Sequence, residues 1–311
     1  METVACNLCG SAETRPFAEL SDLLLEKPDV HATLVQCVNC GLVYQNPRPT
    51  PVEIGEHYPL EYESYADLAV DKKRNWLLQK AIDYGSRKRV RFVTRYKSQG
   101  GRLLDIGCAA GAFMLGMEAH GGWQTYGVEL SEEVALLARS RHGLEVLPGT
   151  LEQASFGDEV FDVVTMWDVF EHLHDPTATL REIHRVLKPG GLLVLRVPNL
   201  ASWDARLFGP YWAGLDAPRH LYVFTPWTLE RMLGREGFDV LDHSSAIGSY
   251  MTFALSVRFW LTAHGASEET MRLASRMLYS PLTRLATAPL FYIPSVTLRG
   301  PLVVTTARKR G

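Results

Sequence analysis

The most constraining feature of this sequence is an alternation of short apolar runs with helical segments, which begins near residue 102. Four of the runs are strand-like and cover residues 102–106, 125–128, 161–166 and 191–197. Helical segments fit between them, and Asp175 followed by Pro176 is a typical start for the helix that we predict to end at Leu187. Alternating strands and helices form a mainly parallel sheet with helices on both faces. We therefore predict an α/β fold that binds its ligand at the carboxyl ends of the strands.

The first predicted strand runs directly into a turn of small residues, in the stretch LLDIGCAAG at 103–111. Gly107 can adopt backbone dihedral angles that other residues avoid, as a sharp turn requires. Gly111 and the two alanines before it keep bulky side chains away from the backbone, and a helix is predicted to begin near Ala112. A strand, a small-residue turn and a helix in this order let a nucleoside ligand approach the backbone closely.

Two acidic residues are predicted to lie at the ends of neighbouring strands. Asp105 stands near the end of the first strand, and Glu129 ends the next one in the stretch YGVE. A carboxylate at the second position can accept hydrogen bonds from both hydroxyls of a ribose, in NAD sites as well as in other nucleoside sites. A dinucleotide fingerprint that starts at Gly107 would need glycine where Ala109 and Ala112 stand. The spacing therefore disfavours a site for pyrophosphate.

The order of these segments, together with later ones, resembles the class I methyltransferases that use S-adenosylmethionine. The resemblance covers about residues 100–245 and rests on LDIGCAAG at 104–111, GVE at 127–129, FDVV at 161–164, EHLHDP at 171–176 and LKPGG at 187–191. It implies a Rossmann-like seven-stranded sheet and S-adenosylmethionine as the cofactor. Within the class, the core is similar to ubiquinone-pathway O-methyltransferases. The chain departs from the class at Ala109, where glycine is more common.

The resemblance also implies roles for individual residues. Asp105 would hold the methionine amino group, and Glu129 would bind the ribose. Trp167 and Asp168 would lie beside the sulfonium and the methionine tail, whereas the turn at residues 151–152 would flank the adenine. The cofactor-binding set that we predict, which includes two glycines passing close to the tail, is Asp105, Gly107, Cys108, Ala109, Gly111, Phe113, Glu129, Leu130, Leu151, Trp167 and Asp168.

Four of the five cysteines form two C-x-x-C pairs near the start of the chain. The pairs are Cys6 with Cys9 and Cys37 with Cys40, and each pair is followed by glycine. Two residues between thiolates let a tight turn direct both sulfurs at one metal ion, and the glycine permits the positive φ of such a turn. Four sulfurs would fill the tetrahedral coordination of Zn²⁺ and leave no open position, so we predict a structural zinc ion. A dithiol redox pair and two chance pairs are the alternatives.

Changes in composition predict five segments. The stretch NPRPTP at 46–51 ends the cysteine-containing module, because its prolines continue neither a strand nor a helix. The predicted division is a zinc-ribbon-like zinc-binding module at 1–50, a linker and helical lid region at 51–99, the methyltransferase core at 100–248, a helical insertion at 249–297, and a final strand and tail at 298–311. A cysteine module in front of such a core is similar to sugar C-methyltransferases that act on nucleotide-linked keto sugars.

The linker region contains a basic helical stretch. Residues 67–97 have helical spacing, and ten Lys or Arg stand against two Asp between Asp71 and Lys97. Such a density suits binding to nucleic acid or to anionic lipid, but a solvated helix face gives the same pattern. The whole chain has a net charge of −3 and a pI near 6.4. We therefore expect a solvated helix, and nucleic acid as the principal partner is disfavoured.

Three tyrosines stand just ahead of the core, at Tyr58, Tyr62 and Tyr65. Tyrosines of the resembling sugar methyltransferases occupy a similar place, which implies a lid over the acceptor pocket. Packing in the core or between domains is the alternative for all three side chains. The two interpretations differ in whether removal of residues 1–66 would abolish acceptor binding and spare cofactor binding.

Transfer of a methyl group to oxygen or carbon requires a residue that removes a proton from the acceptor. The segment DAPRHLY at 216–222 follows the predicted strand at 191–197, where this fold holds substrate-side residues. Because histidine titrates near neutral pH, we predict His220 as the catalytic base and His172 as the second candidate, with a structural histidine as the alternative. Arg219 could bind an anionic part of the acceptor or form a surface ion pair.

The segment at 249–297 is predicted to be inserted between the last strand of the core at 100–248, which would be the sixth of the sheet, and a final strand at 302–307. Helical spacing of apolar residues from Met271 to Leu278 indicates an amphipathic helix pair. Such a pair could pack over the acceptor side, form a homodimer or contact a membrane surface. No apolar window is long enough to cross a bilayer, and the first ten residues show no targeting signal. We therefore expect a cytoplasmic monomer or homodimer.

The function that the sequence predicts is transfer of a methyl group from S-adenosylmethionine to a small molecule, such as a sugar or another polar metabolite. A zinc-knuckle binding or scaffold protein with a cofactor-sensing core is one alternative, and an RNA or DNA methyltransferase is another. The acidic residues and the small-residue turn that a cofactor needs are present, which disfavours a degenerate core. Nothing in the sequence separates oxygen from carbon or nitrogen as the acceptor atom.

Overall fold

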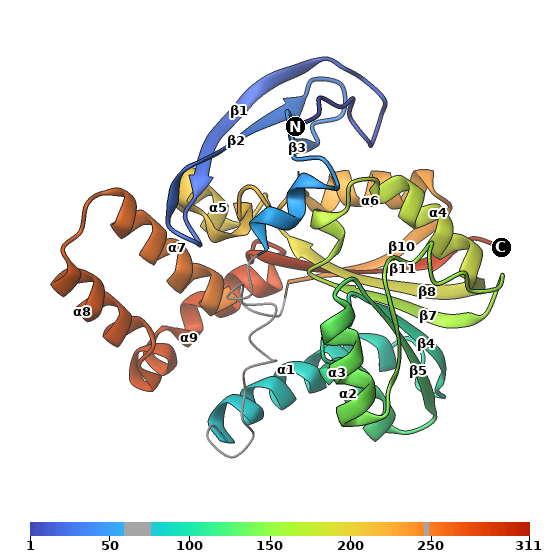
Figure 1. Ribbon diagram of the computed structural model, residues 1–311. Helices are drawn as coiled ribbons and strands as arrows, with labels where there is room; N and C mark the ends of the chain where they lie inside the picture. The colour runs from blue at the N-terminus through green and yellow to red at the C-terminus, as the bar shows by residue number, and fades with distance from the viewer. Residues whose placement is uncertain (59–75, 246–248) are drawn as a thin grey trace.

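Seven strands form the central sheet of the computed structural model, which describes residues 1–58, 76–245 and 249–311 (Figure 1). Their order in the sheet is β10-β11-β8-β7-β4-β5-β6. Neighbours from β8 to β6 pair in parallel, and β11 is antiparallel to both of its neighbours. The bounds are β4 Gly101–Ile106, β5 Trp123–Glu129, β6 Glu145–Pro148, β7 Phe161–Trp167, β8 Leu187–Pro198, β10 Phe238–Ser244 and β11 Leu302–Lys309. The predicted Rossmann-like α/β sheet is therefore confirmed.

Helices cover both faces of this sheet (Figure 1). They are α1 Trp76–Thr94, α2 Ala112–His120, α3 Glu132–His142, α4 Pro176–Val186, α5 Trp203–Phe208 and α6 Pro226–Arg235. Successive residues of β7 point to opposite faces, so Val163 belongs to one hydrophobic cluster with Val93 of α1, and Val164 belongs to another with Ile183 of α4. The helix predicted at 67–97 is α1, and the predicted residues before 76 lie outside the described part of the chain.

Local sequence signals set the start of α4 and α6. Asp175 accepts a hydrogen bond from the N–H of Ala178 at 3.0 Å, and Thr225 accepts one from the N–H of Thr228 at 3.1 Å. Asp175 is the predicted start of its helix, and both residues are of the types that favour this position. Helix α4 ends one residue earlier than predicted, because Leu187 already belongs to β8, which is longer than the run at 191–197.

A second sheet contains the N-terminal strands β1 Thr14–Asp22, β2 Lys27–Cys37 and β3 Val43–Gln45, together with β9 Tyr222–Val223, in the order β1-β2-β3-β9. Strand β9 follows the core in the sequence, yet it pairs antiparallel with β3 through Val43 with Val223 and Tyr44 with Tyr222. Leu42 and Tyr44 also share one hydrophobic cluster with residues of α4 and α6. The module predicted at 1–50 is therefore joined to β9 by hydrogen bonds and to helices α4 and α6 of the core by packing.

The C-terminal insertion consists of three helices, α7 Ser249–Ala263, α8 Glu268–Leu278 and α9 Pro281–Val296. The predicted helix pair was wrong in number, because the apolar sequence of α7 lacks the clear amphipathic spacing of α8. Phe253 of α7 contacts Phe208 of α5 and Phe291 of α9. None of the helices within the described residues combines the length and the apolar character that a bilayer crossing needs.

Short 3-10 helices shape the loops around the carboxyl edge of the central sheet. They are η1 Glu53–His57, η3 Phe170–His172, η4 Gly209–Tyr211 and η5 Ala213–Leu215. Helix η3 follows β7, and the segment with η4 and η5 leads into β9. These loops bring His172 and His220 to the region between the two sheets.

Candidate functional site

The turn after β4 has the backbone that its small residues imply. Gly107, Ala109 and Gly111 have φ angles of +69°, +47° and +83°. A Cβ on Gly107 would lie 2.4 Å from Val169 Cγ2, and one on Gly111 would lie 2.1 Å from Leu144 Cδ1. Glycine is therefore favoured at both positions by conformation and by space. Ala109 holds its methyl group in the left-handed region, at the position where the resembling class more often has glycine.

Glu129 is held beside this turn at the end of β5. Its Oε2 accepts a hydrogen bond from the N–H of Ala109 at 2.9 Å, and its Oε1 accepts one from the N–H of Ser131 at 3.0 Å. The residue is 9% exposed. A carboxylate can accept about four hydrogen bonds, so each oxygen keeps a lone pair for a further donor. This geometry fits the predicted contact with ribose hydroxyls.

Asp105 lies deeper than Glu129. Its Oδ1 accepts a hydrogen bond from the hydroxyl of Thr165 in β7 at 2.6 Å, and the residue is almost completely buried. Burial raises the pKa of this carboxyl to about 7, although the Thr165 hydrogen bond opposes the shift. Asp105 thus contacts Thr165 of the neighbouring strand β7, and its contact with a methionine amino group stays a prediction.

The end of β7 brings together aromatic and charged side chains. The ring of Trp167 contacts Phe113 of α2, with centroids 5.2 Å apart. Trp167 Nε1 is buried and has no hydrogen-bond partner in the described part of the chain. Asp168 has a φ of +60° and forms a two-point ion pair with Arg196 of β8. A buried N–H without a partner is a donor that a ligand could use.

The other predicted cofactor residues flank this region. Leu130 follows Glu129 and is 74% exposed, whereas Cys108 and Leu151 are buried. Glu152 accepts a hydrogen bond from a threonine of α4. Phe113 lies in the first turn of α2, and the other predicted cofactor residues lie on or just after strands β4, β5, β6 and β7, whose parallel arrangement brings their carboxyl ends to one edge.

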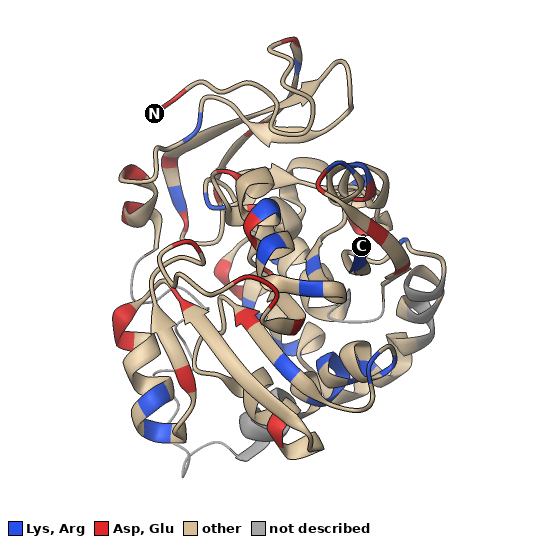
Figure 2. Cartoon of the chain, turned by 90° about the vertical axis from the view of Figure 1, so that its right-hand side faces the viewer, with Lys and Arg blue, Asp and Glu red and all other residues tan. Residues whose placement is uncertain are grey.

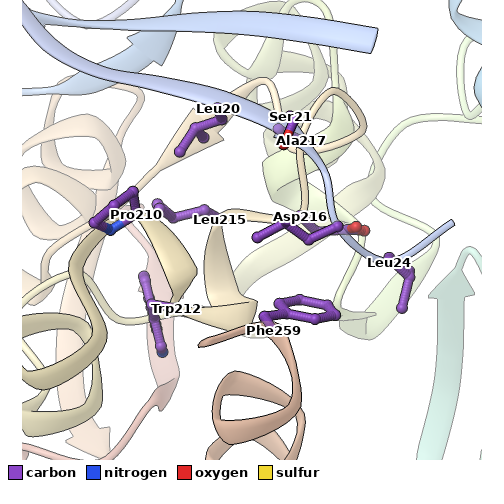
Figure 3. Close-up of a pocket in the computed structure, with 10 residues that line it drawn as sticks. Leu20, Ser21, Leu24, Pro210, Trp212, Leu215, Asp216, Ala217 and Phe259 are labelled. Carbon is purple, nitrogen blue, oxygen red and sulfur yellow. The ribbon is translucent and has the colours of Figure 1, made fainter. Parts of the chain in front are cut away.

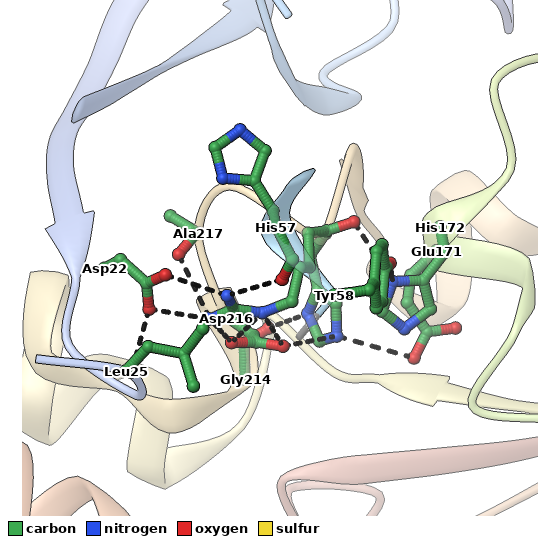
Figure 4. A network of polar contacts seen from close by, with 11 residues as sticks. Asp22, Leu25, His57, Tyr58, Glu171, His172, Gly214, Asp216 and Ala217 are labelled. Carbon is green, nitrogen blue, oxygen red and sulfur yellow. Dashed lines mark hydrogen bonds and ion pairs between the residues drawn. The ribbon is translucent and has the colours of Figure 1, made fainter. Parts of the chain in front are cut away.

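The two predicted bases, His172 and His220, contact each other, with ring centroids 4.6 Å apart (Figure 4). His220 Nδ1 lies 2.9 Å from the carbonyl oxygen of Gly214. Because a carbonyl only accepts, Nδ1 carries the hydrogen and Nε2 carries the lone pair in the neutral ring. Burial lowers the pKa of both imidazoles, to about 3 for His172, and thus favours the neutral form.

Two carboxylates face His220 Nε2. Glu171 Oε1 lies 4.0 Å away, and Asp216 Oδ2 lies 3.9 Å away. Neither oxygen of the buried Glu171 has a hydrogen-bond partner among the described residues, and burial raises the pKa of this carboxyl well above its usual range. Glu171, His172 and His220 present ligand atoms within 4.8 Å of one another, a donor set that could hold a metal ion. Sequence reasoning missed Glu171, although it stands next to His172.

Arg219 is completely buried and donates hydrogen bonds to Asp22 and Asp216, so it forms no surface ion pair. Its carbonyl oxygen lies 3.0 Å from His172 Nδ1. Tyr58, the first of the predicted lid tyrosines, places its hydroxyl 2.8 Å from the same nitrogen. Tyr62 and Tyr65 lie outside the described residues. Neither Asp22 nor Asp216 was predicted, and no local pattern marks Asp22, which is 197 positions from Arg219.

The four N-terminal cysteines lie together at the C-terminal end of β2. Cys6 Sγ is 3.4 Å from Cys40 Sγ, and Cys9 Sγ is 3.5 Å from Cys37 Sγ. All four sulfurs lie within 4.8 Å of one another, and the glycine after each pair has a positive φ, +77° and +74°. Sulfurs bound tetrahedrally to zinc at 2.3 Å are about 3.8 Å apart. The donor set therefore fits the predicted zinc ion.

A small cavity lies beside the segment that contains η4 and η5 and that precedes His220 (Figure 3). Its walls come from the end of β1, from the segment with η4 and η5, and from α7. The lining is mostly apolar and includes Leu20, Leu24, Trp212, Leu215 and Phe259, with Asp216 as its charged member. Asp216 thus borders both this cavity and His220.

Comparison with known proteins agrees with this geometry. A family of sequences described as "Methyltransferase domain" matches residues 78–243, which is more than half of the chain. The chain belongs to this methyltransferase family. Membership accounts for the seven-stranded sheet and the small-residue turn, and it establishes the protein as an S-adenosylmethionine-dependent methyltransferase.

Two curated relatives show how far this methyltransferase is matched in sequence. The ubiquinone biosynthesis O-methyltransferase of Xanthomonas oryzae pv. oryzae is 33% identical over 156 residues, which cover 47% of this chain and 63% of that protein. The protein of the same name from Ruegeria pomeroyi is 39% identical over 169 residues, which cover 51% of this chain and 68% of that protein. This methyltransferase thus spans about two thirds of the length of these relatives.

A solved structure supports the fold of this methyltransferase. The [4+2]-cyclase SpnF aligns with a TM-score of 0.54 and 24% identity, over 85% of this chain and 97% of that chain. At this identity the likeness concerns the fold alone. The likeness therefore carries no information about the reaction of this methyltransferase.

Proposed function

We propose that this methyltransferase transfers a methyl group from S-adenosylmethionine to an oxygen of a small molecule, with His220 as the base. The observation that carries the proposal is the hydrogen bond between His220 Nδ1 and the carbonyl of Gly214. It leaves the lone pair on Nε2, which faces the space between Glu171 and Asp216. A neutral imidazole in this orientation can accept a proton from an acceptor hydroxyl.

A nearby carboxylate supports the same role. When His220 takes a proton, the Asp216 carboxylate at 3.9 Å would stabilise the positive imidazolium. The Asp216 side chain is largely buried, so its effect on the imidazolium is stronger than it would be at the surface. His172 contacts His220 and Tyr58, and we propose that it orients the acceptor or the lid rather than removing the proton.

We propose that the cofactor lies along the carboxyl edge of β4, β5 and β7. Bound S-adenosylmethionine supplies a methyl group activated by its sulfonium charge. Glu129 would accept hydrogen bonds from the ribose, and the backbone at Gly107 would lie beside the methionine tail. The unpartnered Nε1 of Trp167 would donate to the ligand. The four cysteines would hold a structural zinc ion that stabilises the N-terminal sheet.

The acceptor is proposed to be a small hydroxylated metabolite, and a sugar or another polar metabolite stays our prediction for its class. The names of the relatives, ubiquinone biosynthesis O-methyltransferases, support transfer to oxygen. A nucleic-acid acceptor receives less support, because the chain has a net charge of −3 and the ribbon in Figure 2 carries Lys and Arg interspersed with Asp and Glu.

The test begins with titration calorimetry of the zinc-loaded chain with S-adenosylmethionine and with S-adenosylhomocysteine. Binding of both is expected, and the absence of heat from both would contradict the proposed cofactor site. A panel of phenols and nucleotide-linked sugars is then screened for formation of S-adenosylhomocysteine. With the best acceptor, His220→Gln should lower the single-turnover rate roughly 100- to 10,000-fold while cofactor affinity is kept. The exposed His120 provides the control His120→Gln.

A further inference from the structure

Asp22, at the end of β1, forms an ion pair with Arg219 in the loop that precedes β9 (Figure 4). Its Oδ2 accepts a hydrogen bond from Arg219 Nη1 at 2.8 Å, and its Oδ1 accepts one from Arg219 Nη2 at 2.7 Å. Both side chains are completely buried. Asp22 Oδ1 also accepts a hydrogen bond from the N–H of Leu25 at 3.0 Å, which fixes its orientation. A two-point contact of this kind fixes the direction of the guanidinium plane.

The rest of the Arg219 guanidinium holds the turn that contains it. Nη2 donates to Asp216 Oδ1 at 2.7 Å, and Nε donates to both Asp216 oxygens at 3.1 and 3.2 Å. Asp216 has a φ of +24°, a backbone conformation that L residues rarely adopt. Strain of this kind persists where the surrounding contacts hold the residue in place. The guanidinium therefore stabilises an otherwise unfavourable turn.

This turn sets the position of His220. The N–H groups of Arg219 and His220 both donate to the carbonyl oxygen of Asp216, at 2.9 and 3.1 Å. The carbonyl of Gly214, which accepts from the imidazole, lies on the same turn. A change in the conformation of this turn would therefore break the contact that assigns the hydrogen to Nδ1. On the other side of the turn, Leu221 O accepts a hydrogen bond from the N–H of Gln45 in β3.

We propose that Asp22 is a positioning residue for His220, which acts through Arg219 and Asp216. The proposal rests on the proposed function of His220 as the base. It assigns a role in the reaction to the N-terminal module: β1 supplies the carboxylate that fixes Arg219, and β3 fixes the strand that follows His220. The ring of His220 then keeps its hydrogen on Nδ1 and its lone pair toward the acceptor.

The experiment reads the His220 ring directly and needs no acceptor. The full chain, loaded with zinc, labelled with ¹⁵N-histidine and saturated with S-adenosylhomocysteine, is studied by NMR at neutral pH, and His220→Gln assigns the signals. The parent protein is expected to show the Nδ1–H form alone. Asp22→Asn should give a mixture of the two ring tautomers, and Asp22→Glu should restore the single form in part. Asp29→Asn on β2 is the matched control, because Asp29 is exposed on the same ribbon.

Asp22→Asn leaves the buried Arg219 with one carboxylate fewer, which could prevent folding. The double variant Asp22→Asn with Arg219→Gln removes both charges and is expected to show the same mixture of tautomers. An unchanged His220 signal in the folded variants would overturn the positioning role. A similar change in Asp29→Asn, or loss of zinc and of S-adenosylhomocysteine affinity in every Asp22 variant, would reduce Asp22 to general structural support. The failure of His220→Gln to affect methyl transfer would instead refute the proposed function alone.

Discussion

Glu129 Oε2 accepts a hydrogen bond from the backbone N–H of Ala109 at 2.9 Å. This contact joins the end of β5 to the small-residue turn after β4, so the turn and the carboxylate that we propose to bind the ribose form one unit. The other oxygen of Glu129 accepts from the N–H of Ser131, the capping residue of α3. The position of the carboxylate is thus fixed before any ligand binds, which reduces the entropic cost of binding.

Glu129→Gln should weaken the binding of S-adenosylhomocysteine by roughly 10- to 100-fold, because hydrogen bonds to a charged group contribute about 1.5 to 3 kcal/mol. The amide oxygen of glutamine can still accept from the Ala109 N–H, but its NH₂ group would face the Ser131 N–H, so the free energy of unfolding should also fall by about 1 to 3 kcal/mol. Titration calorimetry measures the affinity, and Glu132→Gln at the start of α3 is the control. An unchanged affinity would remove Glu129 from the ribose site.

Gly111→Ala should lower the free energy of unfolding by about 2 to 4 kcal/mol, since the new Cβ meets Leu144 Cδ1 at 2.1 Å and φ is +83°. Ala109→Gly, in the same turn, should change it by less than about 1 kcal/mol. There, relief of the left-handed alanine is offset by the greater freedom of glycine in the unfolded chain. Urea denaturation of both variants checks the contrast, and equal effects would contradict it.

The purified chain should contain one zinc ion, and Cys37→Ser should lose it together with several kcal/mol of stability, on the order expected for a structural site. Cys108→Ser is the control, because Cys108 lies outside the four-cysteine cluster. Metal analysis by mass spectrometry and thermal melting measure both effects. Zinc retained in Cys37→Ser, or lost in Cys108→Ser, would argue against the predicted ligand set.

Asp105 should make the stability of the ligand-free protein fall as the pH rises from about 4 to 7. Burial raises the pKa of its carboxyl to about 7 in the folded state from 3.8, so the unfolded chain loses the proton first. The loss is complete above pH 7 and is on the order of a few kcal/mol. Melting temperatures from pH 4.5 to 8 should fall less steeply in Asp105→Asn. The exposed Asp158 provides the control Asp158→Asn, which should follow the parent.

The parts of the fold that were predicted from the sequence are those with local signals. The apolar runs of β4, β5 and β7, the capping residue Asp175 and the turn glycines depend on residues within a few positions of each other. The number of C-terminal helices was predicted wrongly, because α7 is apolar and lacks a clear amphipathic period. Periodicity identifies an amphipathic helix better than one with this composition.

The candidate site was predictable only where its residues follow a strand. Glu129 and Trp167 lie at strand ends, and the parallel sheet brings such ends together. Asp22 and Arg219 are 197 positions apart, and their contact depends on how the N-terminal ribbon packs on the loop before β9. Neither hydrophobic periodicity nor residue spacing carries information about such a contact, so the ion pair emerged only from the three-dimensional structure.

The pairing of β3 with β9 has a consequence for protein engineering. The N-terminal strands β1 to β3 contact the segment at 214–223 across one interface. A hybrid enzyme that exchanges only one of the two parts would therefore combine mismatched surfaces. An exchange of domains between relatives should therefore replace residues 1–50 and residues 214–223 together.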